Sequence, residues 1–119
     1  MLPLTQDFAE RRGAPRRPVR VTVALQIEGR PLLTVRTVEV SASGVGLSCP
    51  INLPLGTRCQ LSFLIPLAGR PIELRMQGAM VMHSVLSQHD GGFRLGCQFV
   101  QLPSDIGQRL QAFARSAGL

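Results

Sequence analysis

Apolar and polar residues alternate strictly over residues 19–28, and this two-residue period returns in most of the later segments. The apolar face of that first segment consists of Val19, Val21, Val23, Leu25 and Ile27. Such alternation is typical of a half-buried strand. It recurs at 59–65 and 93–99, with glycine and proline turns between, and Gly78 within 72–85 predicts a bulge. The pattern therefore predicts about six short antiparallel strands.

The hydrophobic period changes only after Pro103. Ile106, Leu110 and Phe113 are spaced i, i+4 and i+7, which predicts an amphipathic helix over 104–117 with Ser104 as its N-cap. A helix with one apolar stripe is stable when it docks on the sheet. The sequence therefore predicts an all-β fold, a small antiparallel barrel closed by a C-terminal helix.

Size and composition limit the class of protein. With 119 residues, 45% of them hydrophobic, the chain has the size of one globular domain. It contains no apolar run of the roughly 20 residues that a membrane-spanning helix needs, so no membrane insertion is expected. The first residues lack the charge and apolar pattern of a secretory signal, so a cytoplasmic location is expected. Cys49, Cys59 and Cys97 are odd in number and far apart, which predicts buried free thiols.

All thirteen basic residues are arginines, and five of them lie within residues 10–20, just before the first predicted strand. The net charge of +6 predicts an anionic partner. Arginine presents a planar fork of donors that suits phosphates and guanine edges. Arg12 and Arg16 are stiffened by Pro15 between them and Pro18 after them, which lowers the ordering cost of binding. On charge alone, however, a basic, disordered arm fits equally well.

A second polar segment spans residues 39–47. Glu39 and Ser41 are two residues apart, so both side chains point to the same face of a strand. Gly44 and Gly46 permit positive φ and a close approach of backbone to a ligand. A carboxylate beside a hydroxyl complements the N1–H and N2 amine of guanine. Taken alone, the segment also fits an ordinary bend between two strands.

Catalysis is not expected. His83 and His89 are the only histidines, and neither has a cysteine or carboxylate at metal-ligand spacing. No serine stands in a nucleophile elbow, and no pair of carboxylates stands out. The sequence predicts no enzyme, no metal site and no cofactor, and His83 is expected to be a strand-face residue with an ordinary partner.

Three segments together resemble a known family. Residues 12–16, Arg-Gly-Ala-Pro-Arg, resemble the RxxxR motif of PilZ domains, and residues 39–44, Glu-Val-Ser-Ala-Ser-Gly, resemble their [D/N]xSxxG motif. Residues 94–100 and the helix after them are similar to the family's last strand and helix. The resemblance implies a six-stranded barrel that binds the bacterial second messenger cyclic di-GMP. It also implies a flexible tail over 1–10 and one domain over 11–117, with an arginine-rich ligand loop (11–18), the barrel (19–101) and the helix (104–117).

The resemblance assigns roles to the arginines. Arg12 and Arg16 would clamp phosphates and stack on or hydrogen-bond to guanine, and Arg11 would assist them. Arg17 and Arg20 are interpreted as general positive charge.

The same resemblance assigns roles on the barrel. Ser41 and Gly44 would line the guanine pocket, and Glu39 stands where the family has Asp or Asn. Its extra methylene is expected to weaken binding without abolishing it. Gly96 lies out of phase with the core residues on either side of it, so we expect it to leave room for the flat face of the ligand.

Three functions remain open from the sequence. The first is a non-enzymatic cyclic di-GMP receptor whose arginine loop changes conformation on binding and which signals through an unidentified partner protein. The second is a PilZ-like barrel that has lost nucleotide binding and serves as a protein-interaction module. The third, a nucleic-acid-binding barrel, is disfavoured, because the chain has no Trp or Tyr to stack on bases and its phenylalanines fall in apolar phase.

Overall fold

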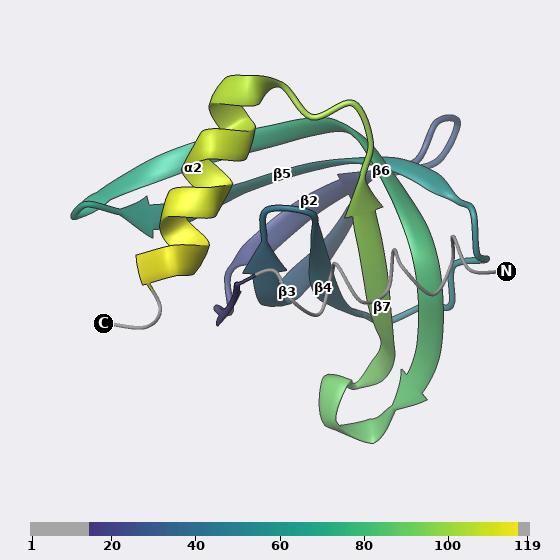
Figure 1. The fold of residues 1–119 in the computed structure, drawn as a ribbon. Coiled ribbons are helices and arrows are strands. Elements are labelled where there is room, and N and C mark those ends of the chain that lie inside the picture. The colour runs from purple at the N-terminus through teal and green to yellow at the C-terminus, as the bar shows by residue number, and fades with distance from the viewer. Residues whose placement is uncertain (1–14, 117–119) are drawn as a thin grey trace, which may run out of the picture.

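The structure is a computed structural model that describes residues 15–116 of the chain. Seven strands are followed by one helix within this range (Figure 1). In chain order the elements are β1 (Arg16–Pro18), β2 (Thr22–Gln26), β3 (Leu33–Ser41), β4 (Gly44–Cys49), β5 (Arg58–Leu67), β6 (Arg70–Ser87), the 3-10 turn η1 (Gln88–Asp90), β7 (Gly92–Phe99) and α2 (Ser104–Arg115).

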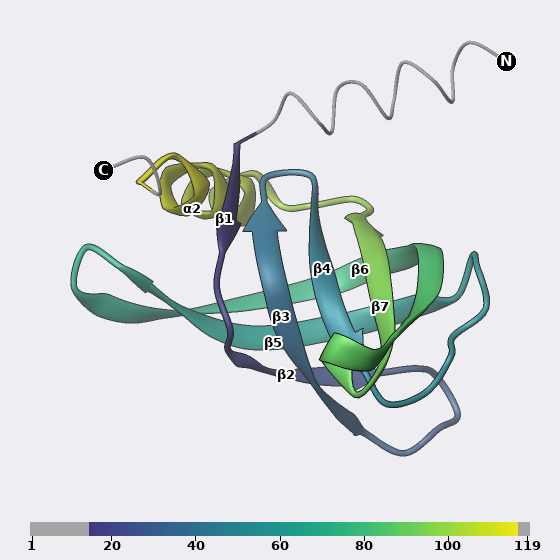
Figure 2. The same cartoon turned by 90° about the horizontal axis from the view of Figure 1, so that it is seen from below.

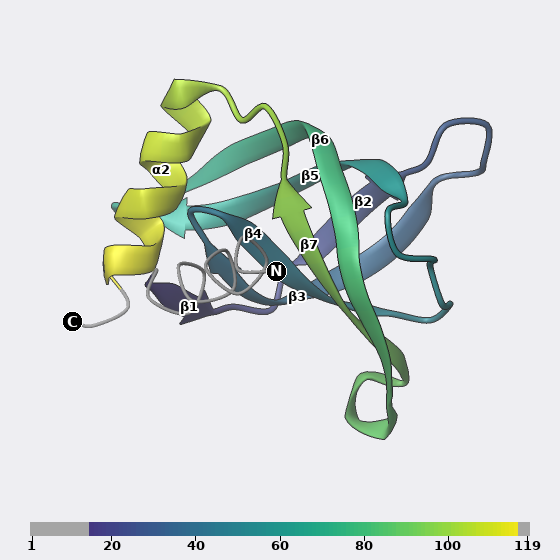
Figure 3. The ribbon, with the colours of Figure 1, turned by 45° about the vertical axis from the view of Figure 1, so that its right-hand side comes forward.

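Six of the strands close into a barrel. They are hydrogen-bonded in the order β3-β2-β5-β6-β7-β4, and β4 pairs again with β3, so the sheet returns to its first strand (Figure 3). Every pairing is antiparallel. The predicted fold, a six-stranded antiparallel barrel with one C-terminal helix, is confirmed.

β1 and β2 lie end to end along one edge of β3. β1 pairs with Glu39–Ser41, whereas β2 pairs with Leu33–Arg36. Residues 19–21 interrupt this edge. The sequence analysis expected a loop up to residue 18 and a continuous strand from residue 19, so the structure differs on both sides of that boundary.

Thr37 is the physical reason for the interruption. Its side chain is fully buried, and its hydroxyl accepts a hydrogen bond from the Val21 N–H at 2.9 Å and donates one to the Val19 carbonyl. The Thr37 N–H in turn donates to the Val21 carbonyl at 2.9 Å. A threonine side chain thus replaces part of the ladder between β3 and the preceding segment, which a period-two pattern does not reveal.

The barrel interior is filled by the apolar residues that alternate along the strands. Fully buried examples are Val23, Leu25, Leu47, Leu61, Ile65, Leu74, Val81 and Leu95. The side chains of Leu110 and Phe113 on α2 join the same cluster. α2 contacts β1, β3 and β5 and covers one end of the barrel, with β1 beside it (Figure 2).

The start of α2 corrects one prediction. Ser104 is the first helical residue, and the N-cap position belongs to Pro103, which has extended backbone angles and makes no capping hydrogen bond. The apolar stripe is as predicted, because Leu110 and Phe113 are fully buried and Ile106 is partly buried. The helix ends at Arg115, and residue 117, the predicted end, lies outside the described residues.

Gly78 marks the predicted irregularity in the long strand β6. The β5–β6 register shifts between Cys59 and Leu61, opposite Gly78. The Gly78 carbonyl accepts a hydrogen bond from the Val100 N–H at 2.8 Å, and a Cβ at Gly78 would stand only 2.8 Å from the Val100 carbonyl oxygen. The absence of a side chain at this position therefore lets the chain after β7 pack against β6.

Candidate functional site

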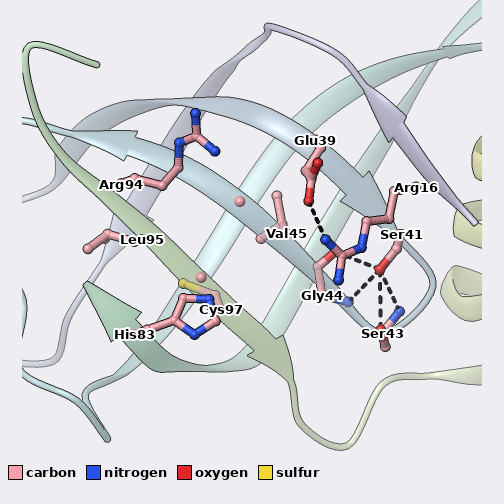
Figure 4. Close-up of a pocket in the computed structure, with 12 residues that line it drawn as sticks. Arg16, Glu39, Ser41, Ser43, Gly44, Val45, His83, Arg94, Leu95 and Cys97 are labelled. Atoms are coloured by element: carbon pink, nitrogen blue, oxygen red, sulfur yellow. Dashed lines mark hydrogen bonds and ion pairs between the residues drawn. The ribbon is translucent and has the colours of Figure 1, made fainter. Parts of the chain in front are cut away.

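A cavity of about 220 Å³ lies on the outside of the barrel, where the β3–β4 corner faces β6 and β7 (Figure 4). Its lining residues are Arg16, Glu39, Ser41, Ser43, Gly44, Val45, Gly46, His83, Arg94, Leu95, Gly96 and Cys97. Five of the seven residues that the sequence analysis selected line this one cavity. The other two, Arg11 and Arg12, lie outside the described residues.

Ser41 shapes the corner between β3 and β4. Its Oγ accepts hydrogen bonds from the N–H groups of Ser43 and Gly44, both at 3.2 Å, and the residue is only 7% exposed. A serine hydroxyl that bonds the backbone two and three residues ahead holds a tight turn in place. The first contribution of Ser41 is therefore to the shape of the cavity wall.

Gly44 is required for a reason other than the predicted one. Neither Gly44 nor Gly46 adopts the positive φ that glycine permits. A Cβ at Gly44 would overlap the carbonyl oxygen of Cys97 on the paired strand β7. The glycine thus allows β4 and β7 to approach closely beneath the cavity.

Arg16 connects the two motifs. Its Nη1 donates to the Oε2 of Glu39 at 3.1 Å, an ion pair between residues 23 positions apart in sequence (Figure 4). The antiparallel pairing of β1 with β3, in which Arg16 stands opposite Ser41, produces this contact. The side chains are 42% and 36% exposed, so the ion pair adds only a few tenths of a kcal/mol to stability. The contact with Glu39 can therefore be exchanged for one with an anionic ligand at little cost in stability.

Gly96 lines the cavity, but the space above it is occupied. A Cβ at Gly96 would overlap the Nε2 side of the His83 imidazole. His83 on β6 stands opposite Gly96 on β7, next to a register shift between Val81 and His83. We expected this space to face the ligand directly, whereas in the structure the imidazole fills it.

His83, Ser43 and Arg94 are cavity residues that the sequence analysis did not select. Ser43 lies inside the second motif, so its position was a usable signal. Arg94 begins the segment that resembles the last strand of the family, which was also a signal. No sequence pattern indicated His83, because its position opposite Gly96 depends on the irregular pairing of β6 with β7.

Arg17 corrects a second interpretation. Its guanidinium lies 4.2 Å from the ring centre of Phe113, and its Nη1 donates to the Oγ of Ser116 at 2.7 Å and to the Phe113 carbonyl at 3.4 Å. Such contacts tie β1 to the last turn of α2. Arg17 is a structural residue and not simply general positive charge.

The three cysteines are free and buried, as predicted. Cys97 forms part of the cavity floor. The pKa of its thiol is raised, because its hydrogen bond with Cys59 and its burial both favour the protonated form. Burial also raises the pKa of the Cys49 thiol. The hydrogen bond with Cys97 instead lowers the pKa of the Cys59 thiol. All three thiols are buried, so they contribute apolar packing to the barrel.

Two further features bear on the kind of site. Within residues 15–116, no three His, Cys, Asp or Glu side chains gather in a way that would hold a metal ion. No helix among the described residues is long and apolar enough to cross a membrane. The cavity is instead bordered by arginines, hydroxyls and exposed backbone at a strand corner, which suits a polar anionic ligand.

The sequence matches the PilZ domain family over residues 10–116. The chain therefore belongs to the PilZ domain family, whose barrel and C-terminal helix it shares. No curated protein matches the sequence.

Solved structures share the fold at low sequence identity. The inhibitor of motility MotI/DgrA from Bacillus subtilis matches with a TM-score of 0.74 and 13% identity over 87% of this chain, and this chain spans 49% of that protein. A tetrameric PilZ domain protein from Xanthomonas campestris matches with a TM-score of 0.65 and 12% identity, covering 87% of each chain. The PilZ domain of YcgR from Escherichia coli, in a structure with c-di-GMP, matches with a TM-score of 0.61 and 15% identity over 87% of this chain and 88% of that one.

Proposed function

We propose that this PilZ domain is a non-enzymatic receptor for cyclic di-GMP. The observation that carries the proposal is the 3.1 Å contact between Arg16 and Glu39, which joins the arginine segment to the β3–β4 corner on one cavity. Family membership and the c-di-GMP in the YcgR PilZ structure support the choice of ligand. We also propose that the protein is bacterial and acts in the cytoplasm, as expected from the sequence.

The cavity is large enough to enclose only part of cyclic di-GMP. Its volume of about 220 Å³ is below the ~300–1,000 Å³ typical of sites that enclose a whole drug-sized molecule. We infer that one guanine enters it, with Ser41 and Gly44 along its wall and Glu39 accepting from the base. The phosphates then lie outside, within reach of Arg16, and we propose that Arg12 and Arg11 bind them as well.

Signalling then requires a partner protein. When the phosphates attract Arg16, the guanidinium exchanges Glu39 for the ligand, and the segment before β1 is drawn onto the barrel. Arg17 in the same strand holds the end of α2. A ligand that draws Arg16 away from Glu39 therefore changes β1 and the surface next to α2, and we propose that the partner binds there.

One observation favours the second candidate, a barrel that has lost nucleotide binding. Glu39 replaces the family's Asp or Asn, and its longer side chain already pairs with Arg16. In this alternative the ion pair closes the site, and the domain acts as an interaction module without a nucleotide.

Calorimetric titration with cyclic di-GMP separates the two candidates. The wild type is expected to bind, Arg12→Ala and Arg16→Ala to bind much more weakly, and Arg70→Ala to bind as the wild type does. Arg70 is the matched control because it begins β6 at the β5–β6 turn and does not line the cavity. Absence of heat and of thermal stabilisation in the wild type would favour the interaction module. Salt-sensitive binding of any oligonucleotide without preference for cyclic di-GMP would instead indicate a nucleic-acid binder.

A further inference from the structure

We propose that His83 is a ligand contact, and that its imidazole packs against the guanine that enters the cavity. This inference rests on the proposed function. His83 belongs neither to the arginine motif (residues 12–16) nor to the motif at the β3–β4 corner (residues 39–44). His83 comes from β6, on the side of the cavity away from Arg16 (Figure 4).

Gly96 leaves space for the imidazole ring of His83. Gly96 is the residue opposite His83, and any side chain there would collide with the imidazole. The glycine lets the ring lie against the backbone of β7 at the cavity edge. A flat ring held against a flat strand presents its other side outward, where a second planar group can stack on it.

His83 forms no polar contact that would explain its position within the described residues. The residue is exposed, and no hydrogen bond or ion pair of its imidazole is found within residues 15–116. An ordinary surface histidine is also exposed, but it does not line a cavity above a glycine. Both ring nitrogens are available to a ligand.

The arrangement of the cavity as a whole also supports the contact. Val45 and Cys97 line the cavity between His83 on one side and Arg16 on the other, and their side chains are buried in the barrel core (Figure 4). Arg94 adds a second guanidinium on the His83 side. A purine can stack between two planar groups of this kind, because histidine and arginine both stack on bases.

The test is cyclic di-GMP titration of His83→Ala, His83→Phe and the control His89→Ala. His89 lies in η1 and does not line the cavity. We expect His83→Ala to weaken binding about tenfold, since stacking of one base contributes roughly that factor or more. His83→Phe should stay within about threefold of the wild type, because it keeps a flat ring. Equal affinity of His83→Ala and the wild type would overturn the inference.

A second readout reports contact directly. The chain has two histidines, so the imidazole carbon–proton signals of untagged protein are assigned with the His89→Ala variant. Addition of cyclic di-GMP should shift the His83 signal and leave that of His89 in place, and an unmoved His83 signal would refute the contact. Binding that Arg16→Ala removes and His83→Ala leaves intact would overturn only this inference. Absence of wild-type binding would overturn it together with the proposed function.

Discussion

Arg16 and Arg17 are neighbours in one short strand, yet they lie in different environments. Arg16 faces the cavity, with its side chain 42% exposed, and forms an ion pair with Glu39. Arg17 faces α2, partly buried, over the Phe113 ring and hydrogen-bonded to Ser116. Successive side chains of a strand point to opposite sides, so β1 places one arginine in the site and the other in the fold.

This contrast predicts that Arg16 matters for ligand binding and Arg17 for stability. A half-exposed ion pair contributes little to stability, so an anion can replace Glu39 beside Arg16 at small cost. A guanidinium packed on an aromatic ring, with a hydroxyl to accept its N–H, contributes more. Substitution of Arg16 should therefore mainly lower ligand affinity, and substitution of Arg17 should mainly lower the free energy of unfolding.

The largest effect is expected for Arg16→Ala on ligand binding. Loss of a charged hydrogen-bond donor should weaken cyclic di-GMP binding by about tenfold to a hundredfold. The free energy of unfolding in urea should change by less than about 0.5 kcal/mol, because the ion pair with Glu39 is half exposed. A stability loss as large as that of Arg17→Ala would show that Arg16 belongs to the fold as well.

The next largest effect is expected for Arg17→Ala on stability. Removing the cation–π contact and the hydrogen bond to Ser116 should lower the free energy of unfolding by about 1–2 kcal/mol, measured by urea titration. Arg17→Lys is the control, since it keeps the charge but not the planar group. Cyclic di-GMP affinity should stay within about threefold of the wild type. A loss of affinity equal to that of Arg16→Ala would remove the distinction between the two residues.

Salt should act on the two arginines differently. Raising the ionic strength from about 0.05 M to about 0.5 M should weaken ligand binding several-fold, because exposed phosphate contacts are screened. The stability difference between the wild type and Arg17→Ala should hardly change, since the contact with Phe113 is partly buried. Calorimetry and urea unfolding at both salt concentrations measure the two quantities. Salt-independent binding would place the phosphates away from the arginines.

The smallest effect is expected for Glu39→Asp. The shorter carboxylate restores the residue type of the family motif and loosens the ion pair with Arg16. Cyclic di-GMP affinity should be preserved or rise by about threefold, with stability nearly unchanged. A marked fall in affinity by calorimetry would mean that the length of Glu39 is matched to this cavity.

Much of the fold and about half of the site followed from local patterns. Period-two alternation identified the strands, and the stripe of Ile106, Leu110 and Phe113 identified the helix. Arg16 and Ser41 could be predicted as site residues because both belong to motifs that are recognised from spacing along the chain alone. Thr37 could not be anticipated, because its hydroxyl replaces backbone pairing between segments that lie apart in sequence.

The sequence by itself determined the barrel class and its closing helix, and it predicts a phosphate-binding arginine segment before a corner that suits guanine. Each of these follows from periodicity or from the spacing of a few residues. Only the tertiary structure decided that Arg17 holds α2 and that His83 covers Gly96. Those two contacts depend on the register and irregularities of strand pairing, and register is an outcome of the whole packed barrel.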